Sequence, residues 1–232
     1  MIDRLIRFQS VLGWLTLAML AAGLYLVLTA PADFQQGGSV RILFMHVPSA
    51  KMALLCYVAL SVASILYLWK RWEGADILSE ALTGVGMVFT AVTLASGSIW
   101  GKPMWGTWWA WDARLTSMLV LLIIYVGLMA LRNGIEDPVK SARATAVLAL
   151  VGAVDLPIIH FSVKWWRTLH QPASFTGSGA PKIVGPLLTP LVVMAVAFII
   201  MGTYMTVVRA RTIRAQRQLE ALEEEKSWQD DR

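Results

Sequence analysis

The stretch "LLTPLVVMAVAFIIMGTYMTVV", residues 187–208, contains no charged side chain. About 20 predominantly apolar residues are enough for a helix to cross the hydrocarbon core of a bilayer. Because the backbone finds no water to bond to in that core, such a stretch is expected to be helical. It therefore predicts one membrane-spanning helix.

Five further stretches are also long and predominantly apolar: 11–29, 47–69, 77–99, 113–131 and 142–160. The 232 residues are 57% hydrophobic, with a mean hydropathy of +0.61, which is unusual for a soluble domain. Apart from Asp155, the charged residues within these five stretches lie near the ends, where long side chains reach the interface. We predict an all-α integral membrane protein with a six-transmembrane-helix bundle over 1–208 and a charged, solvated helical tail over 209–232.

The basic residues predict the orientation of this bundle. One side of the predicted topology carries thirteen of the twenty lysines and arginines: Arg4, Arg7, Lys70, Arg71, Arg132, Lys140, Arg143, Arg209, Arg211, Arg214, Arg217, Lys226 and Arg232. The positive-inside rule places that side, with both termini, in the cytoplasm. The net charge of +5 then reflects topology and does not indicate nucleic-acid binding.

Several other classes of site are disfavoured. Cys56 is the single cysteine, so the chain can form no internal disulfide, and no CxxCH motif for covalent haem attachment occurs. The "GKP" at 101–103 lacks the other residues of a phosphate-binding loop. The "APA" at 30–32 resembles a signal-peptide cleavage site, but the preceding apolar run is long, and we expect an uncleaved first helix.

The unusual chemistry lies in the three predicted outward segments, 30–46, 100–112 and 161–186. "WGKPMWGTWWAW", residues 100–111, contains five tryptophans. Aromatic belts at membrane interfaces account for isolated residues such as Trp14 and Trp69. They do not account for the whole set Trp100, Trp105, Trp108, Trp109 and Trp111, which predicts a surface for a large planar ligand.

All three histidines, His46, His160 and His170, lie on or near the same outward side. Singly, each suits a membrane interface, but two imidazoles on different segments could bind one iron from both sides. Indoles can pack against a porphyrin, and nearby cations can pair with its propionates. The candidate propionate contacts are Arg41, Lys102, Arg114, Lys164 and Arg167.

"WGTWWAWD" at 105–112, "RILFMHVPSA" at 41–50 and "LPIIHFSVKWWRTLHQP" at 156–172 resemble the CcmC family of haem-handling membrane proteins of system I cytochrome c maturation. The resemblance covers about residues 8–208. It implies transient, non-covalent binding of haem b at the outer, periplasmic face of the bacterial inner membrane. It also implies delivery to the haem chaperone CcmE, with the ABC transporter subunits CcmA and CcmB and the small subunit CcmD as partners.

The resemblance also implies roles for single residues. His46 and His170 map onto the two axial ligands of the haem iron. The platform for haem and chaperone maps onto Trp105, Gly106, Trp109, Trp111 and Asp112. His160 maps onto neither ligand and is expected to be structural.

Other functions remain open at this point. No acid–base pair or nucleophile is evident, so we expect a binding and presentation protein, not an enzyme, with ATP hydrolysis on a partner subunit. A haem or solute export permease is one alternative, favoured by Asp155 within a span. Asp155 could pair with Arg114, face water or bind a partner. A cytochrome b-type electron carrier is a weaker alternative, because no predicted span has a histidine near its middle.

Overall fold

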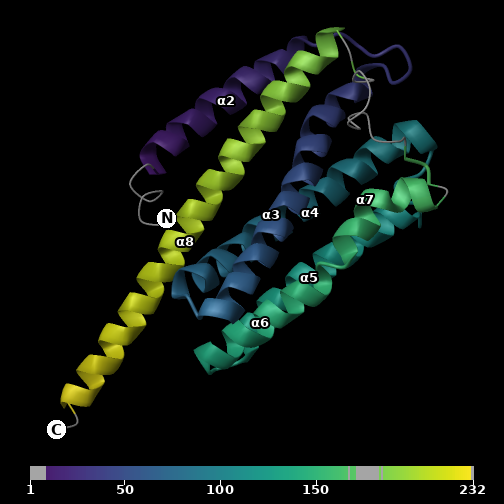
Figure 1. Ribbon diagram of the computed structural model, residues 1–232. Helices are drawn as coiled ribbons and strands as arrows, with labels where there is room; N and C mark the ends of the chain where they lie inside the picture. The colour runs from purple at the N-terminus through teal and green to yellow at the C-terminus, as the bar shows by residue number, and fades with distance from the viewer. Residues whose placement is uncertain (1–8, 167, 171–182, 184, 231–232) are drawn as a thin grey trace.

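The computed structural model describes residues 9–166, 168–170, 183 and 185–230, and within these it is helical, with one isolated β-bridge and no strand (Figure 1). Six stretches are long and apolar enough to cross a membrane, which confirms the predicted all-α membrane bundle. The elements are α2 (Gln9–Thr29), the 3-10 helix η1 (Gly38–Ile42), α3 (Leu43–Lys70), α4 (Glu73–Trp105), α5 (Ala113–Gly134), α6 (Pro138–Gly152), α7 (Asp155–Trp165), η2 (Gly185–Leu187) and α8 (Leu188–Asp230).

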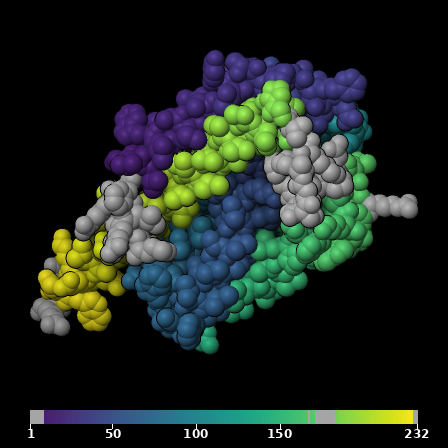
Figure 2. All heavy atoms as spheres, turned by 45° about the horizontal axis from the view of Figure 1, so that its top comes forward, coloured from purple at the N-terminus to yellow at the C-terminus, as the bar shows by residue number. Residues whose placement is uncertain are grey.

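The helices α3 and α4 form the centre of the bundle and pack on each other along their length. On one side α8 packs against both, and α2 lies along α8 (Figures 1 and 2). On the other side lie α5, α6 and α7. Successive spans run in opposite directions. The segments between α2 and α3, between α4 and α5, and after α7 therefore lie at the same end of the bundle.

Two buried tyrosines fix the packing of the central helices. The Tyr57 hydroxyl donates to the Ala149 carbonyl of α6, and the Tyr125 hydroxyl donates to the Ala53 carbonyl of α3, each at 3.1 Å. Their rings meet edge to face with centroids 5.1 Å apart. A Cβ on Gly152 would overlap the Tyr57 hydroxyl, so that position requires glycine.

The fifth span is broken, where the sequence predicted one helix over 142–160. The α-helix ends at Gly152 and restarts at Asp155 as α7. Pro157 explains the break, because proline has no N–H for the carbonyl four residues earlier and its ring collides with that carbonyl. The break places Asp155 in the first turn of α7, with the side chain buried.

The charged tail continues α8 without interruption to Asp230. Its beginning differs from the expected solvated helix, because Ala210 and Ile213 are buried against Ile77 and Ala81 of α4. The remainder, residues 218–229, is exposed.

An ionic cluster of Asp76, Glu80, Arg132 and Arg217 fastens this region to α4 and α5. Asp76 accepts from Arg132 at 2.6 Å and from Arg217 at 2.8 Å. Glu80 accepts from Arg217 at 2.8 Å. Both acids of the cluster lie on α4, and each of its arginines comes from a different helix.

Candidate functional site

The three outward segments meet at one end of the bundle, which we call the motif end and define by residues 33–46, 96–114, 162–166 and 168–170. Trp100 Nε1 donates to Gln36 Oε1 at 3.1 Å, which joins the first segment to the second. His170 Nδ1 lies 2.9 Å from Asp112 Oδ2, which joins the second to the third. Side chains far apart in the sequence are thereby brought together.

Asp112 is the structural centre of the motif end. It has extended backbone dihedrals and precedes α5, and its Oδ1 accepts from Leu115 N at 2.8 Å, which makes it the N-cap of that helix. Its Oδ2 faces the third segment, where it lies 2.9 Å from His170 Nδ1 and accepts from Leu169 N at 3.3 Å. Only 7% of the carboxylate side chain is exposed. One buried carboxylate therefore starts α5 and holds the histidine segment.

The contact with Asp112 fixes the tautomer of His170. A carboxylate only accepts hydrogen bonds, so the imidazole must carry its proton on Nδ1 and donate it, which leaves the lone pair on Nε2. The ring also meets Trp105 edge to face, with centroids 4.8 Å apart. Burial lowers the pKa of His170 below its usual value, and the charge of Asp112 opposes this shift. The imidazole is thus neutral at ordinary pH, as an iron ligand must be.

His46 lies in the first turns of α3, inside the helix and not before it. Its Nδ1 is 3.1 Å from the Ser96 hydroxyl of α4, and that hydroxyl donates its own proton to the Val92 carbonyl at 2.7 Å. Ser96 is therefore the acceptor, so His46 also carries its proton on Nδ1 and its lone pair on Nε2.

The surroundings of His46 depend on a glycine and a tryptophan of α4. A Cβ built on Gly97 would lie 3.0 Å from His46 Cε1, so the ring packs closely on the backbone of α4 at this point. Trp100, one turn later, meets the imidazole with centroids 5.6 Å apart.

Arg114 lies in the first turn of α5, two residues after Asp112, which contacts His170. Arg114 is held by a hydrogen bond from its Nε to Ser162 Oγ at 3.2 Å. Two imidazoles, each with a free Nε2 lone pair, and one cation therefore share the motif end.

The tryptophan segment forms the border of this site. Trp105 is the last residue of α4, and Gly106 ends the helix with a φ of 76°, a conformation that favours glycine. Trp109 and Trp111 meet edge to face, with ring centroids 5.5 Å apart, and Trp111 is 76% exposed. The buried Trp109 Nε1 has no hydrogen-bond partner among the described residues. It is a donor available to an acceptor on a ligand.

The other predicted cations make contacts of a different kind. Arg41 donates to the Ala30 carbonyl at 3.4 Å, and Lys102 donates to the Gly106 carbonyl at 3.0 Å. The Lys164 ammonium lies 5.6 Å from the Phe161 ring centroid. Arg167 lies outside the described residues. Of the candidate propionate contacts, Arg114 lies two residues after Asp112 and contacts the third segment through Ser162.

His160 is exposed on α7 and packs edge to face on Phe161, with ring centroids 4.7 Å apart. Asp155 is buried, and its Oδ2 has no hydrogen-bond partner within the described residues. Arg114 Nε donates to Ser162, and no ion pair between Asp155 and Arg114 occurs among the described residues.

Sequence reasoning missed Ser96, Gly97 and Gln36 as parts of the site, and it counted Trp100 only among the tryptophans. Ser96 and Trp100 are four residues apart, so they share one helix face. This spacing could have marked Ser96, but many small polar residues lie on α4, and the pattern alone does not show which one faces a histidine.

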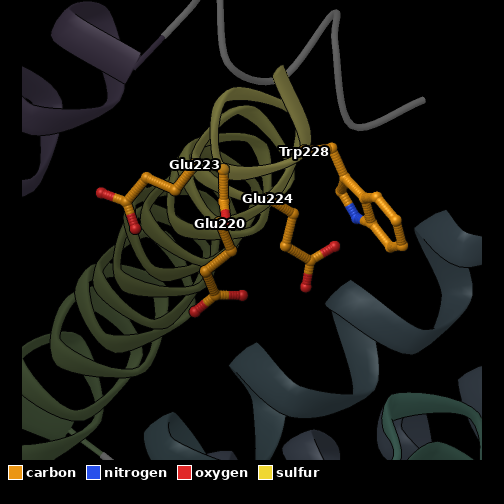
Figure 3. Close-up of a pocket in the computed structure, with 5 residues that line it drawn as sticks. Glu220, Glu223, Glu224 and Trp228 are labelled. Atoms are coloured by element: carbon orange, nitrogen blue, oxygen red, sulfur yellow. The ribbon is translucent and has the colours of Figure 1, made fainter. Parts of the chain in front are cut away.

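Two hollows elsewhere on the molecule do not resemble a haem site. One lies on the exposed end of α8 and is lined by Glu220, Glu223, Glu224, Ser227 and Trp228 (Figure 3). Its carboxylates would repel the propionates of haem. The other, of about 60 Å³, adjoins the ionic cluster and is too small for a porphyrin.

Comparison with known proteins places the chain among haem exporters. The family model of heme exporter protein C (CcmC) matches residues 2–225. A heme exporter protein C of Bradyrhizobium diazoefficiens is 46% identical over 216 residues, covering 92% of this chain and 82% of the relative. The heme exporter protein C of Escherichia coli K12 is 41% identical over 217 residues, covering 89% and 86%. A ccmC-like mitochondrial protein of cytochrome c biosynthesis from Marchantia polymorpha is 38% identical over 199 residues, covering 85% of each chain.

Proposed function

The chain belongs to the heme exporter protein C (CcmC) family, and on this premise we propose that it binds haem at the motif end and presents it to a haem chaperone for c-type cytochrome biogenesis. The observation that carries the proposal is the pair His46 and His170. Each imidazole is held through Nδ1 by its own acceptor, so each directs a lone pair from Nε2. Bis-imidazole ligation of haem iron requires two such nitrogens.

The rest of the motif end suits the haem macrocycle and its charges. The residues proposed as platform are Trp105, Gly106, Trp109, Trp111 and Asp112. Arg114 supplies a positive charge for a propionate, and the unpartnered Trp109 Nε1–H supplies a further donor. Exposed Trp111 leaves one edge of the site open to a protein that collects the haem.

We infer the membrane arrangement from charge. The basic residues cluster at the end opposite the motif end in the predicted topology, so the positive-inside rule puts the motif end in the periplasm of a bacterial inner membrane. The proposed partners are the chaperone CcmE, the ABC subunits CcmA and CcmB, and the small subunit CcmD. The chain itself acts as a binding and transfer protein for haem b, and ATP is hydrolysed on a partner subunit.

Absorption spectroscopy of the purified protein tests haem binding. Haem is added to the protein in detergent, and the Soret band is recorded for wild type, His46→Ala, His170→Ala and the control His160→Ala. We expect a Soret band in wild type and in the control, and a weakened or shifted band in both ligand variants. An unchanged band in one of these would reassign that ligand. No haem binding in wild type would favour the permease function, for which the buried, unpartnered Asp155 would become the first residue to test.

Site-specific crosslinking tests the presentation step. A photo-reactive amino acid at position 111 is expected to crosslink to the chaperone when haem is supplied, whereas the same group at position 14, on exposed α2, is not. Equal crosslinking at the two positions would contradict the tryptophan segment as the docking surface.

A further inference from the structure

The two histidines are held by acceptors of unequal strength. His170 donates to a carboxylate at 2.9 Å, and His46 donates to a hydroxyl at 3.1 Å. A carboxylate acceptor raises the electron density on the ligating nitrogen of an imidazole and strengthens its bond to a metal. A neutral hydroxyl does so much less, because hydrogen bonds to charged groups are about twice as strong as neutral ones.

The burial of Asp112 increases this difference. The carboxylate side chain is 7% exposed, so little water competes for it or screens its charge. Part of the charge of Asp112 is directed to Leu115 N and Leu169 N, yet the oxygen that faces the imidazole remains anionic. Ser96 has no charge, and its hydroxyl proton is committed to the α4 backbone.

The backbone contacts act in the same direction. Oδ2 of Asp112 also holds Leu169 N, so the carboxylate fixes both the ring of His170 and the chain that carries it. For His46, the only side-chain hydrogen bond to the ring is that from Nδ1 to Ser96 among the described contacts. The ring of His46 is held by neutral groups alone, so it turns away at a smaller cost than the ring of His170.

We propose that His170 is the retained ligand of the haem iron and His46 is the one released first, so that the incoming ligand of the acceptor protein approaches the iron from the side of His46. Asp112 and Ser96 act as positioning residues that set this order. The inference rests on the proposed function, because it presupposes that both histidines bind the iron.

Carbon monoxide tests the order of release, because it replaces the weaker axial ligand of ferrous haem. The reduced complexes of His46→Ala and His170→Ala, each with one remaining histidine, provide reference Fe–C and C–O stretching frequencies by resonance Raman spectroscopy. The CO complex of wild type is expected to match His46→Ala, in which His170 lies opposite the CO. A match to His170→Ala would overturn the proposal.

Two conservative variants keep the test decisive if a single histidine binds haem too weakly. At saturating haem, Asp112→Asn is expected to shift the Fe–C and C–O frequencies of the CO complex, because it changes the acceptor of the ligand opposite CO. Ser96→Ala is expected to leave both frequencies at the wild-type values and to increase the rate of CO binding severalfold. A frequency shift in Ser96→Ala with none in Asp112→Asn would overturn the order of release. A wild type that binds no haem would instead refute the proposed function.

Discussion

Replacement of Asp112 by asparagine separates the two tasks of this side chain. Asparagine caps a helix about as well as aspartate, so the variant keeps an oxygen for Leu115 N and the start of α5. Its amide group then faces His170, where it donates and does not accept. The imidazole is expected to favour the tautomer with its proton on Nε2, so the ring must return this proton to Nδ1, without an acceptor there, before it can bind iron.

The size of the effect follows from the bond that is lost. A hydrogen bond to a charged group contributes about 1.5–3 kcal/mol. Because about 1.4 kcal/mol corresponds to a factor of ten in affinity, Asp112→Asn is expected to weaken haem binding by about 10–100-fold. The assay is a haem titration followed at the Soret band.

Asp137→Asn is the matched control. Asp137 caps α6 in the same manner, through Val139 N and Lys140 N, and no histidine contacts it among the described residues. Its substitution is expected to leave haem affinity unchanged. Equal effects of the two substitutions, or an affinity of Asp112→Asn within twofold of wild type, would refute the tautomer argument.

The same variant makes a prediction about protonation. Burial holds the pKa of His170 below 6.5 in the folded protein, and Asp112 raises it. The folded state therefore binds fewer protons than the unfolded state as the pH falls below 6.5, and stability decreases there. In Asp112→Asn the raising influence is lost, so NMR of ¹⁵N-histidine in haem-free protein should show a still lower pKa. A higher pKa than in wild type would contradict a charged Asp112 beside the ring.

Three further substitutions test other parts of the structure. Gly97→Ala places a Cβ 3.0 Å from His46 Cε1. It should weaken the hydrogen bond between His46 and Ser96 and lower haem affinity about 2–10-fold. Gly84→Ala, with open space around its Cβ, is the control and should leave the Soret titration unchanged. Trp109→Phe removes a buried donor that has no described partner. Thermal unfolding of the haem-free variant should therefore show equal or higher stability, while its haem affinity falls. Lower stability with unchanged affinity would contradict this. Asp76→Asn leaves two arginines without their buried carboxylate and should cost about 3–5 kcal/mol of stability, and a loss below about 1 kcal/mol would show that the cluster is solvated.

The membrane architecture could be predicted from sequence because apolar length is a local property. Residues 187–208 predict a span without reference to any other part of the chain. The helix α4 itself continues beyond the predicted span 77–99, through Lys102 and Pro103 to Trp105. Hydropathy decreases there, but a helix needs only backbone hydrogen bonds and continues until Gly106 reverses φ.

The partners of the histidines could not be predicted, because they depend on how the helices are rotated against one another. Ser96 is one of several small polar residues on α4, including Thr90 and Thr93, and only the packing of α3 on α4 selects it for His46. Asp112 gave a better signal. An aspartate directly before an apolar run is a typical N-cap. The sequence indicated Asp112 as part of the motif, but it did not indicate the contact with His170, 58 residues further along the chain.

Under the proposed function, the two contacts of Asp112 also bear on when the chain can bind haem during synthesis. His46 is in place once α3 and α4 have inserted. His170 follows α7 in the chain, and Asp112, which holds it, lies at the start of α5. A nascent chain therefore has His46 but not His170 in place until five spans have entered the bilayer. Under the proposed function, bis-histidine binding of haem is therefore a property of the nearly completed molecule.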